Sequence, residues 1–145
     1  MSRRQGSRDR GRNKGPQRAT ILYEFWESPA WRSLSPAAVK VWCELRTRYK
    51  RFNNDRLQLP LSYASKGLGL GRSTVARALA ELEEKGFIEK LKQGEFFGHQ
   101  AALYRLTSEP VVDQNDRLIQ GATNDWKSWR PNQTKNSAPV PDKNP

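Results

Sequence analysis

The stretch from Leu61 to Ile88 constrains the fold more than any other part of the sequence. Gly67, Gly69 and Gly71 separate two helical patterns, and glycine tolerates the positive φ angles of a tight turn. The segment 72–85 carries apolar residues at i, i+3, i+4 and i+7, which predicts an amphipathic helix. These apolar residues are Val75, Ala78, Leu79 and Leu82. The stretch therefore predicts two helices joined by a tight turn.

The helical patterns begin and end at residues that favour helix boundaries. Ser35 is a preferred N-cap residue, and proline is favoured at the first helical position, where Pro36 lies. The apolar stripe of this earlier helix consists of Ala38, Val41, Trp42, Leu45 and Tyr49. Asn53-Asn54-Asp55 ends it with turn-forming residues. Gly86 is expected to end the helix at 72–85, with Phe87 making the hydrophobic contact beyond it.

Short β-like segments complete the pattern. Leu57 to Leu61 alternates and ends near a proline, which suits an edge strand, and Ser62 is expected to cap a brief helix at 63–67. Two further segments form the expected hairpin, 87–91 and 101–107. The order helix, strand, helix, turn, helix, hairpin is that of a winged helix-turn-helix. We therefore expect a mainly α fold with a small β-hairpin, of the α+β class.

Charge divides the 145 residues into three parts. The net charge of +11 predicts a polyanionic partner. Residues 1–20 have net charge +6 and no large apolar residue after Met1, so we expect a disordered basic arm. Residues 21–107, with net charge +5, are the expected winged helix-turn-helix domain, and 108–145, with net charge 0, are an extension. This extension is expected to be largely disordered, with a docking segment at 122–130 as one option.

Composition disfavours several classes of protein. A single Cys43 excludes an internal disulfide, and one Cys with one His leaves little to bind a metal. The sequence contains no apolar run long enough to cross a membrane and no secretory signal pattern. No nucleophile–base set, phosphate loop or catalytic carboxylate pair is recognisable. We therefore expect a cytoplasmic, nucleoid-associated protein that is not an enzyme, has no cofactor or metal, and does not bind membranes.

The stretch from Leu61 to Ile88 closely resembles bacterial winged helix-turn-helix proteins. The likeness extends over 28–107 and is sharpest from Gly71-Arg-Ser-Thr-Val to Leu82-Glu-Glu-Lys-Gly-Phe-Ile. It is similar to the group that includes N-terminal domains of phage and plasmid replication proteins, and to small helix-turn-helix regulators. The turn is richer in glycine than the usual pattern. The resemblance implies double-stranded DNA as the partner.

The first turns of the helix at 72–85 hold the residues expected to meet base edges. They are Arg72, Ser73, Thr74 and Arg77. Arginine can make bidentate contacts to guanine, and the serine and threonine can bind phosphate; Ser73 is alternatively an N-cap. Glu81, Glu83 and Glu84 occupy the far half of the helix and are expected to be a solvated helix end.

Three further sets of residues are expected to hold the protein on DNA. On the first helix of the pair, phosphate contacts are assigned to Ser62, Tyr63 and Lys66. The wing carries Lys90, Lys92, Gln93 and His99, which suit an adjacent minor groove. The arm carries Arg3, Arg4, Arg8, Arg10, Arg12, Lys14 and Arg18. The arm suits DNA phosphates or a minor groove, single-stranded RNA, or a solubilising role.

Two aromatic groups and three functions stay open. The cluster around Trp26 and Trp31 suits either the core or a homodimer contact. Trp126 and Trp129 suit docking on the domain or binding of a partner, and the cost of exposing paired Trp favours docking. The function expected first is a bacterial transcriptional regulator. The alternatives are a replication or maintenance factor at origin repeats, and a protein-interaction module with an RNA-binding arm.

Overall fold

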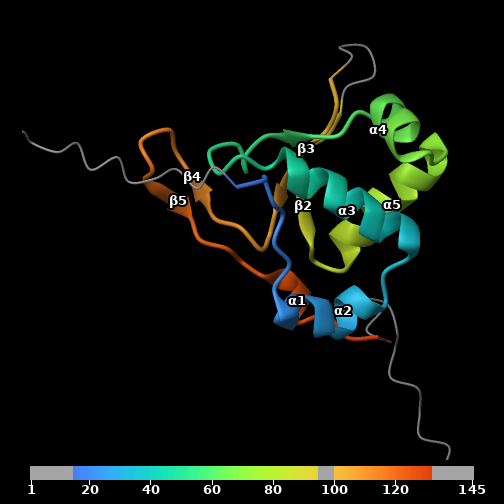
Figure 1. The fold of residues 1–145 in the computed structure, drawn as a ribbon, viewed down its shortest axis with the longest axis horizontal. Coiled ribbons are helices and arrows are strands. Elements are labelled where there is room, and N and C mark those ends of the chain that lie inside the picture. The colour runs from blue at the N-terminus through green and yellow to red at the C-terminus, as the bar shows by residue number, and fades with distance from the viewer. Residues whose placement is uncertain (1–14, 95–99, 132–145) are drawn as a thin grey trace, which may run out of the picture.

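The structure, a computed structural model, describes residues 15–94 and 100–131. At its centre three helices pack with a small antiparallel sheet (Figure 1). The helices are α3 (Pro36–Arg48), α4 (Leu61–Leu68) and α5 (Arg72–Glu84). The sheet has the order β1–β3–β2 and consists of β1 (Leu57–Gln58), β2 (Ile88–Lys92) and β3 (Leu103–Leu106). The predicted α+β winged helix-turn-helix is confirmed.

Helix α3 begins where the sequence predicted. The Ser35 hydroxyl accepts a hydrogen bond from the Ala38 N–H at 3.2 Å, and Pro36 is the first helical residue. The predicted stripe points into the core, where Ala38, Val41, Trp42 and Leu45 are buried. β1 follows as an edge strand that pairs with β3 only.

The turn between α4 and α5 depends on a single left-handed residue. Gly69, at the C-cap of α4, has φ +66°, a conformation that costs side-chain-bearing residues free energy. Gly71 has extended backbone angles and is the N-cap residue of α5. Gly67 lies inside α4. The predicted tight turn is therefore confined to the last two glycines and the leucine between them.

Ser62 was predicted as an N-cap, and an N-cap was the alternative role for Ser73. Both lie inside their helices, which corrects these interpretations. Ser62 is the second residue of α4, and Ser73 is the second residue of α5. The N-cap positions belong to Pro60 and Gly71, whose backbones are extended with ψ of 129° and 151°. α4 begins at Leu61, earlier than predicted, whereas α5 begins at Arg72, as predicted. Both serines are exposed on the helix surface.

Helix α5 ends in a Schellman motif. The Phe87 N–H donates to the Leu82 carbonyl at 2.9 Å, and the Gly86 N–H donates to the Glu83 carbonyl at 3.2 Å. Gly86 has φ +83°, and Phe87 is fully buried beyond it. The predicted C′ glycine is confirmed, and the chain continues from it through Phe87 into β2.

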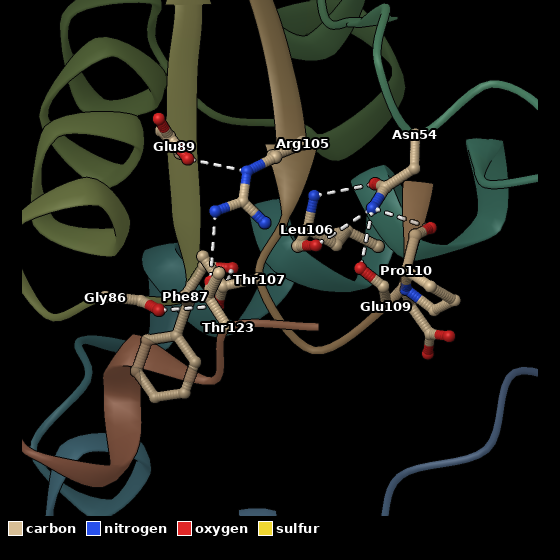
Figure 2. A network of polar contacts seen from close by, with 10 residues as sticks. All are labelled: Asn54, Gly86, Phe87, Glu89, Arg105, Leu106, Thr107, Glu109, Pro110 and Thr123. Carbon is tan, nitrogen blue, oxygen red and sulfur yellow. Dashed lines mark hydrogen bonds and ion pairs between the residues drawn. The ribbon is translucent and has the colours of Figure 1, made fainter. Parts of the chain in front are cut away.

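Asn54 completes the free edge of β3 (Figure 2). The register between β1 and β3 ends at the pair Leu57–Tyr104. Beyond it the Asn54 carboxamide accepts from the Leu106 N–H at 2.8 Å and donates to the carbonyls of Leu106 and Glu109, both at 3.0 Å. Asn54 is 0% exposed. Its side chain therefore replaces a peptide group of the missing strand, a role that the predicted turn did not reveal.

Arg105 joins the hairpin to the chain that follows it. Its guanidinium, 3% exposed, donates through Nε to the Glu89 carboxylate and through Nη2 to Thr123 Oγ1 (Figure 2). The neighbouring Thr107 hydroxyl donates to the Gly86 carbonyl at 2.6 Å. These bonds fix β3 against both β2 and the later segment.

The chain beyond β3 contains elements that the sequence patterns did not predict. β4 (Val111–Val112) and β5 (Leu118–Gln120) form a two-stranded antiparallel sheet, which Figure 1 shows on the side away from α4. A 3₁₀ helix, η1 (Asp125–Lys127), follows. The proline-rich end of the chain lies outside the described residues.

Phe25 is the centre of an aromatic core. It lies on α1 (Tyr23–Glu27), next to α2 (Pro29–Arg32), and its ring centroid is 4.9–5.1 Å from those of Trp31, Trp42, Phe87 and Trp126. Trp126 is only 3% exposed, and Trp129 packs partly buried against the same core. Of the two options for the later tryptophans, the structure therefore shows docking. Phe25 and Trp31 complete the core, whereas Trp26 is 53% exposed.

Candidate nucleic-acid interface

A groove of about 940 Å³ lies between α5, the start of α4 and the β2–β3 hairpin. Arg72, Ala76 and Ala80 line it from α5, and Ser62 lines it from α4. On the hairpin side the lining includes Lys90 and Gln93. In Figure 1 α4 lies at one end of the molecule, and α1 and α2 lie at the other. Residues from all three predicted contact elements of the folded domain thus line one groove.

The N-terminal end of α5 carries the predicted base-contact residues. Arg72, Ser73 and Arg77 are exposed, and Thr74 is half-buried. Within the described part of the chain, neither arginine forms an ion pair. Gly71 offers no side chain to cap the first-turn N–H groups, and the helix dipole adds positive potential there. This end is therefore a cationic surface rich in hydrogen-bond donors.

The four residues do not all line the groove. Arg72 lines the groove, in one row of α5 with Ala76. The other three, Ser73, Thr74 and Arg77, do not line it. Because residues four apart stack on one helix face, Ser73 and Arg77 form the adjacent exposed row. Ala76 and Ala80 were not predicted as part of this surface, and the structure shows both to be exposed in the lining of the groove.

Glu81 is a structural residue, which corrects the expectation of a solvated acidic end. Its carboxylate accepts from the backbone N–H of Ser35 at 2.9 Å, from the Ser35 hydroxyl at 2.6 Å and from Lys85 Nζ at 2.8 Å. Glu83 and Glu84 are exposed, as predicted. Glu81 therefore ties the second half of α5 to the start of α3 and helps to fix the angle at which α5 is presented.

The stability of this contact should depend on pH. Burial by itself raises the pKa of Glu81. The hydrogen bonds from Lys85 and Ser35, together with the positive charge of Lys85, outweigh this effect and lower the pKa below its ordinary value of 4.5. The contact's stabilisation is therefore present above pH 4.5 and disappears as the pH falls through the lower folded-state pKa. We expect Glu81→Gln to cost about 1 kcal/mol at pH 7, measured by denaturant unfolding.

A pH series provides the control for this prediction. The difference between wild type and Glu81→Gln should shrink as the pH is lowered below 4.5, because protonation also removes the charge from the wild-type side chain. Glu84→Gln, at an exposed position of the same helix, should leave stability unchanged. A difference that stays constant from pH 7 to pH 3 would contradict this role of the carboxylate.

The predicted phosphate contacts on α4 are all on the surface. Ser62, Tyr63 and Lys66 are exposed. The Arg48 guanidinium lies 4.7 Å from the centroid of the Tyr63 ring, and its Nη1 donates to the Gln58 carbonyl at 3.3 Å. Arg48 is therefore a further cation beside the start of α4. One indication of this role was visible in the sequence, because Arg48 lies away from the apolar stripe of its predicted helix.

The wing residues lie in different environments. Lys92 and Gln93 are exposed. Lys90 is half-buried, with Nζ 3.9 Å from a Glu83 carboxylate oxygen and 6.0 Å from the centroid of the Tyr104 ring. Lys90 thus links the wing to α5 as well as lining the groove.

Some predicted contact residues fall outside the described part of the chain. These are His99 of the wing and Arg3, Arg4, Arg8, Arg10, Arg12 and Lys14 of the arm. Arg18, the last basic residue of the arm, is described and exposed.

Among the described residues there is no group of three or more His, Cys, Asp or Glu side chains placed to hold a metal ion. In the same residues, no helix has the length and apolar character needed to cross a membrane. Burial raises the pKa of the Cys43 thiol, so this half-buried cysteine is a weak nucleophile.

The fold and the exposed cationic end of α5 define a helix-turn-helix DNA-binding domain. A family model described as the IclR helix-turn-helix domain matches residues 51–92, which include β1, α4, α5 and β2. No curated protein and no solved structure matches the chain. Residues 51–92 are thus similar to the IclR helix-turn-helix domain, which supports a helix-turn-helix DNA-binding domain in this chain. The match does not support the narrower resemblance to phage and plasmid replication proteins, or an RNA-binding role.

Proposed function

We propose that the protein is a bacterial transcriptional regulator that binds double-stranded DNA by placing α5 in the major groove. The observation that carries the proposal is the groove in which Arg72 faces the hairpin and the start of α4. A recognition helix meets base edges with its N-terminal residues, and this end of α5 carries two unpaired arginines among the described residues. The DNA-binding domain points to a regulator rather than an enzyme.

The roles proposed for the side chains follow from their positions. Arg72 and Arg77 contact guanines, each contributing about 1–3 kcal/mol of discrimination. Ser73 and Thr74 contact phosphates. The backbone contacts come from exposed residues of α4 and from the wing: Ser62, Tyr63, Lys66, Lys90, Lys92 and Gln93. The corresponding location of the protein is the cytoplasm, in association with the nucleoid.

Selection of binding sites tests the proposal. The full chain is used to enrich a pool of random double-stranded DNA over several rounds. We expect the pool to converge on one motif that binds with a Kd of about 10⁻⁸ M or tighter at physiological salt. A pool that stays random, with equal affinity for all duplexes, would contradict sequence-specific binding. The recovered motif placed beside a reporter promoter should alter transcription, and occupancy without any change in transcription would contradict the role of regulator.

The basic arm is proposed to add affinity without specificity. Deleting residues 1–14 should weaken binding to all duplexes alike, because the arm contacts phosphates. The slope of log Kd against log salt concentration should flatten by about 0.9 for each phosphate that the arm no longer neutralises. A variant with the arm's arginines replaced by lysines keeps the charge and should keep the slope. An unchanged slope after deletion would exclude the arm from the DNA interface.

A further inference from the structure

We propose that Ala76 contacts the 5-methyl group of a thymine in the major groove and so selects an A·T pair within the bound site. The inference rests on the proposed function, because it assigns a base to a residue of the same interface. It concerns a residue that is neither charged nor able to form a side-chain hydrogen bond. Its effect on specificity is therefore separable from that of the arginines.

The position of Ala76 supports this role. Ala76 is exposed and lines the groove in one row with Arg72, which lies one helical turn towards the N-terminus. Arg77, the other proposed base contact, is its immediate neighbour in sequence. The methyl side chain of Ala76 therefore lies on the same part of α5 as the two arginines that are proposed to meet base edges.

The chemistry of the major groove identifies the ligand. The edges of the base pairs carry hydrogen-bond donors and acceptors, and the thymine 5-methyl is their one apolar group. An alanine side chain cannot satisfy a donor or an acceptor, so a polar base edge pressed against it would give up its bonds to water. A thymine methyl group makes no such bonds. The small size of Ala76 also lets the α5 backbone approach the base pairs closely.

The same row of α5 contains a second alanine that does not fit this role. Ala80 lines the groove but lies within one turn of Glu83 and Glu84, whose exposed carboxylates repel DNA phosphates. By contrast, the four positions on either side of Ala76 contain no acidic residue. The half of α5 that can approach DNA therefore includes Ala76 and ends before Ala80.

Deoxyuridine scanning tests the inference. Each thymine of the site selected by the full-length protein is replaced in turn by deoxyuridine, which removes only the methyl group. For the wild-type protein we expect one thymine whose replacement weakens binding about fourfold, the effect of removing one buried methyl-sized group. For Ala76→Gly, the same replacement should have no effect. Ala80→Gly has the same decrease in helix propensity and should keep the fourfold effect.

The outcomes separate this inference from the proposed function. If a specific site is recovered but no thymine is sensitive, the role of Ala76 is overturned and the proposed function stands. The role is also overturned if the sensitive thymine stays sensitive when the Ala76→Gly variant binds. This comparison requires only that the variant folds, which thermal unfolding checks. The wild-type scan does not depend on any variant. Failure to recover a specific site would overturn the proposed function and this inference together.

Discussion

Replacing Arg72 and Arg77 together with alanine should sharply reduce the preference of the protein for its selected DNA site. Both side chains are exposed at the N-terminal end of α5 and make no ion pair among the described residues, so their removal leaves no charge unpaired. Because each bidentate pairing with guanine is worth about 1–3 kcal/mol, specific affinity should fall by about 30-fold or more. Fluorescence anisotropy with the selected and a scrambled duplex measures the decrease.

A matched variant controls for net charge. Arg32→Ala with Arg117→Ala removes the same charge at exposed positions outside the groove and its lining. This variant should bind somewhat less tightly to both duplexes but keep the ratio of their affinities. If the Arg72 and Arg77 variant also keeps that ratio, α5 does not recognise the bases.

Replacing Asn54 with alanine should destabilise the domain by about 3 kcal/mol, because the buried Leu106 N–H would be left without its partner and the carbonyls of Leu106 and Glu109 would each lose a donor. The effect follows from geometry: β1 ends before it can pair with this part of β3, and the Asn54 carboxamide supplies the missing donor and acceptor. Denaturant or thermal unfolding at neutral pH measures it, with Tm lowered by more than about 10 °C.

The control for Asn54 is another asparagine. Asn115, exposed in the turn between β4 and β5, should tolerate alanine within about 0.5 kcal/mol. Equal stability changes for the two substitutions would show that the carboxamide of Asn54 is not required at the edge of β3.

The sequence predicted the elements whose information is local. The stripes of α3 and α5 have the spacing of one helix face, and the structure buries the main positions of both, such as Val41 and Val75. Ser35 and Gly86 also act within one turn of the chain, as predicted. Local periodicity and end chemistry are sufficient for such elements, because they depend on residues three or four positions apart.

The residues that were missed depend on distant parts of the chain. Glu81 binds Ser35 and Asn54 binds Leu106, in each case across a large sequence separation. In the sequence each looks like an ordinary polar residue on a helix or in a turn. β4 and β5 are only two and three residues long, too short for a periodic pattern to be visible. Their pairing follows from the tertiary structure, so a single sequence could not predict it.

The candidate site was predictable in part for the same reason. The cationic start of α5 is a local feature and was predicted by residue, but the groove requires α4, α5 and the hairpin to be assembled. Arg48, for example, reaches the ring of Tyr63 from α3 only in the folded protein. Ala76 likewise had no polar chemistry by which the sequence could mark it.

Methylation interference is the sharpest test of a recognition helix in the major groove, because it reports which groove of the DNA the protein contacts. Dimethyl sulfate methylates guanine N7 in the major groove and adenine N3 in the minor groove, and the methylated selected site is sorted into bound and free duplex. We expect that N7 methylation of at least one guanine prevents binding, and that this interference disappears in Arg72→Ala or Arg77→Ala. Binding that is indifferent to methylation of every guanine N7 would contradict a recognition helix in the major groove.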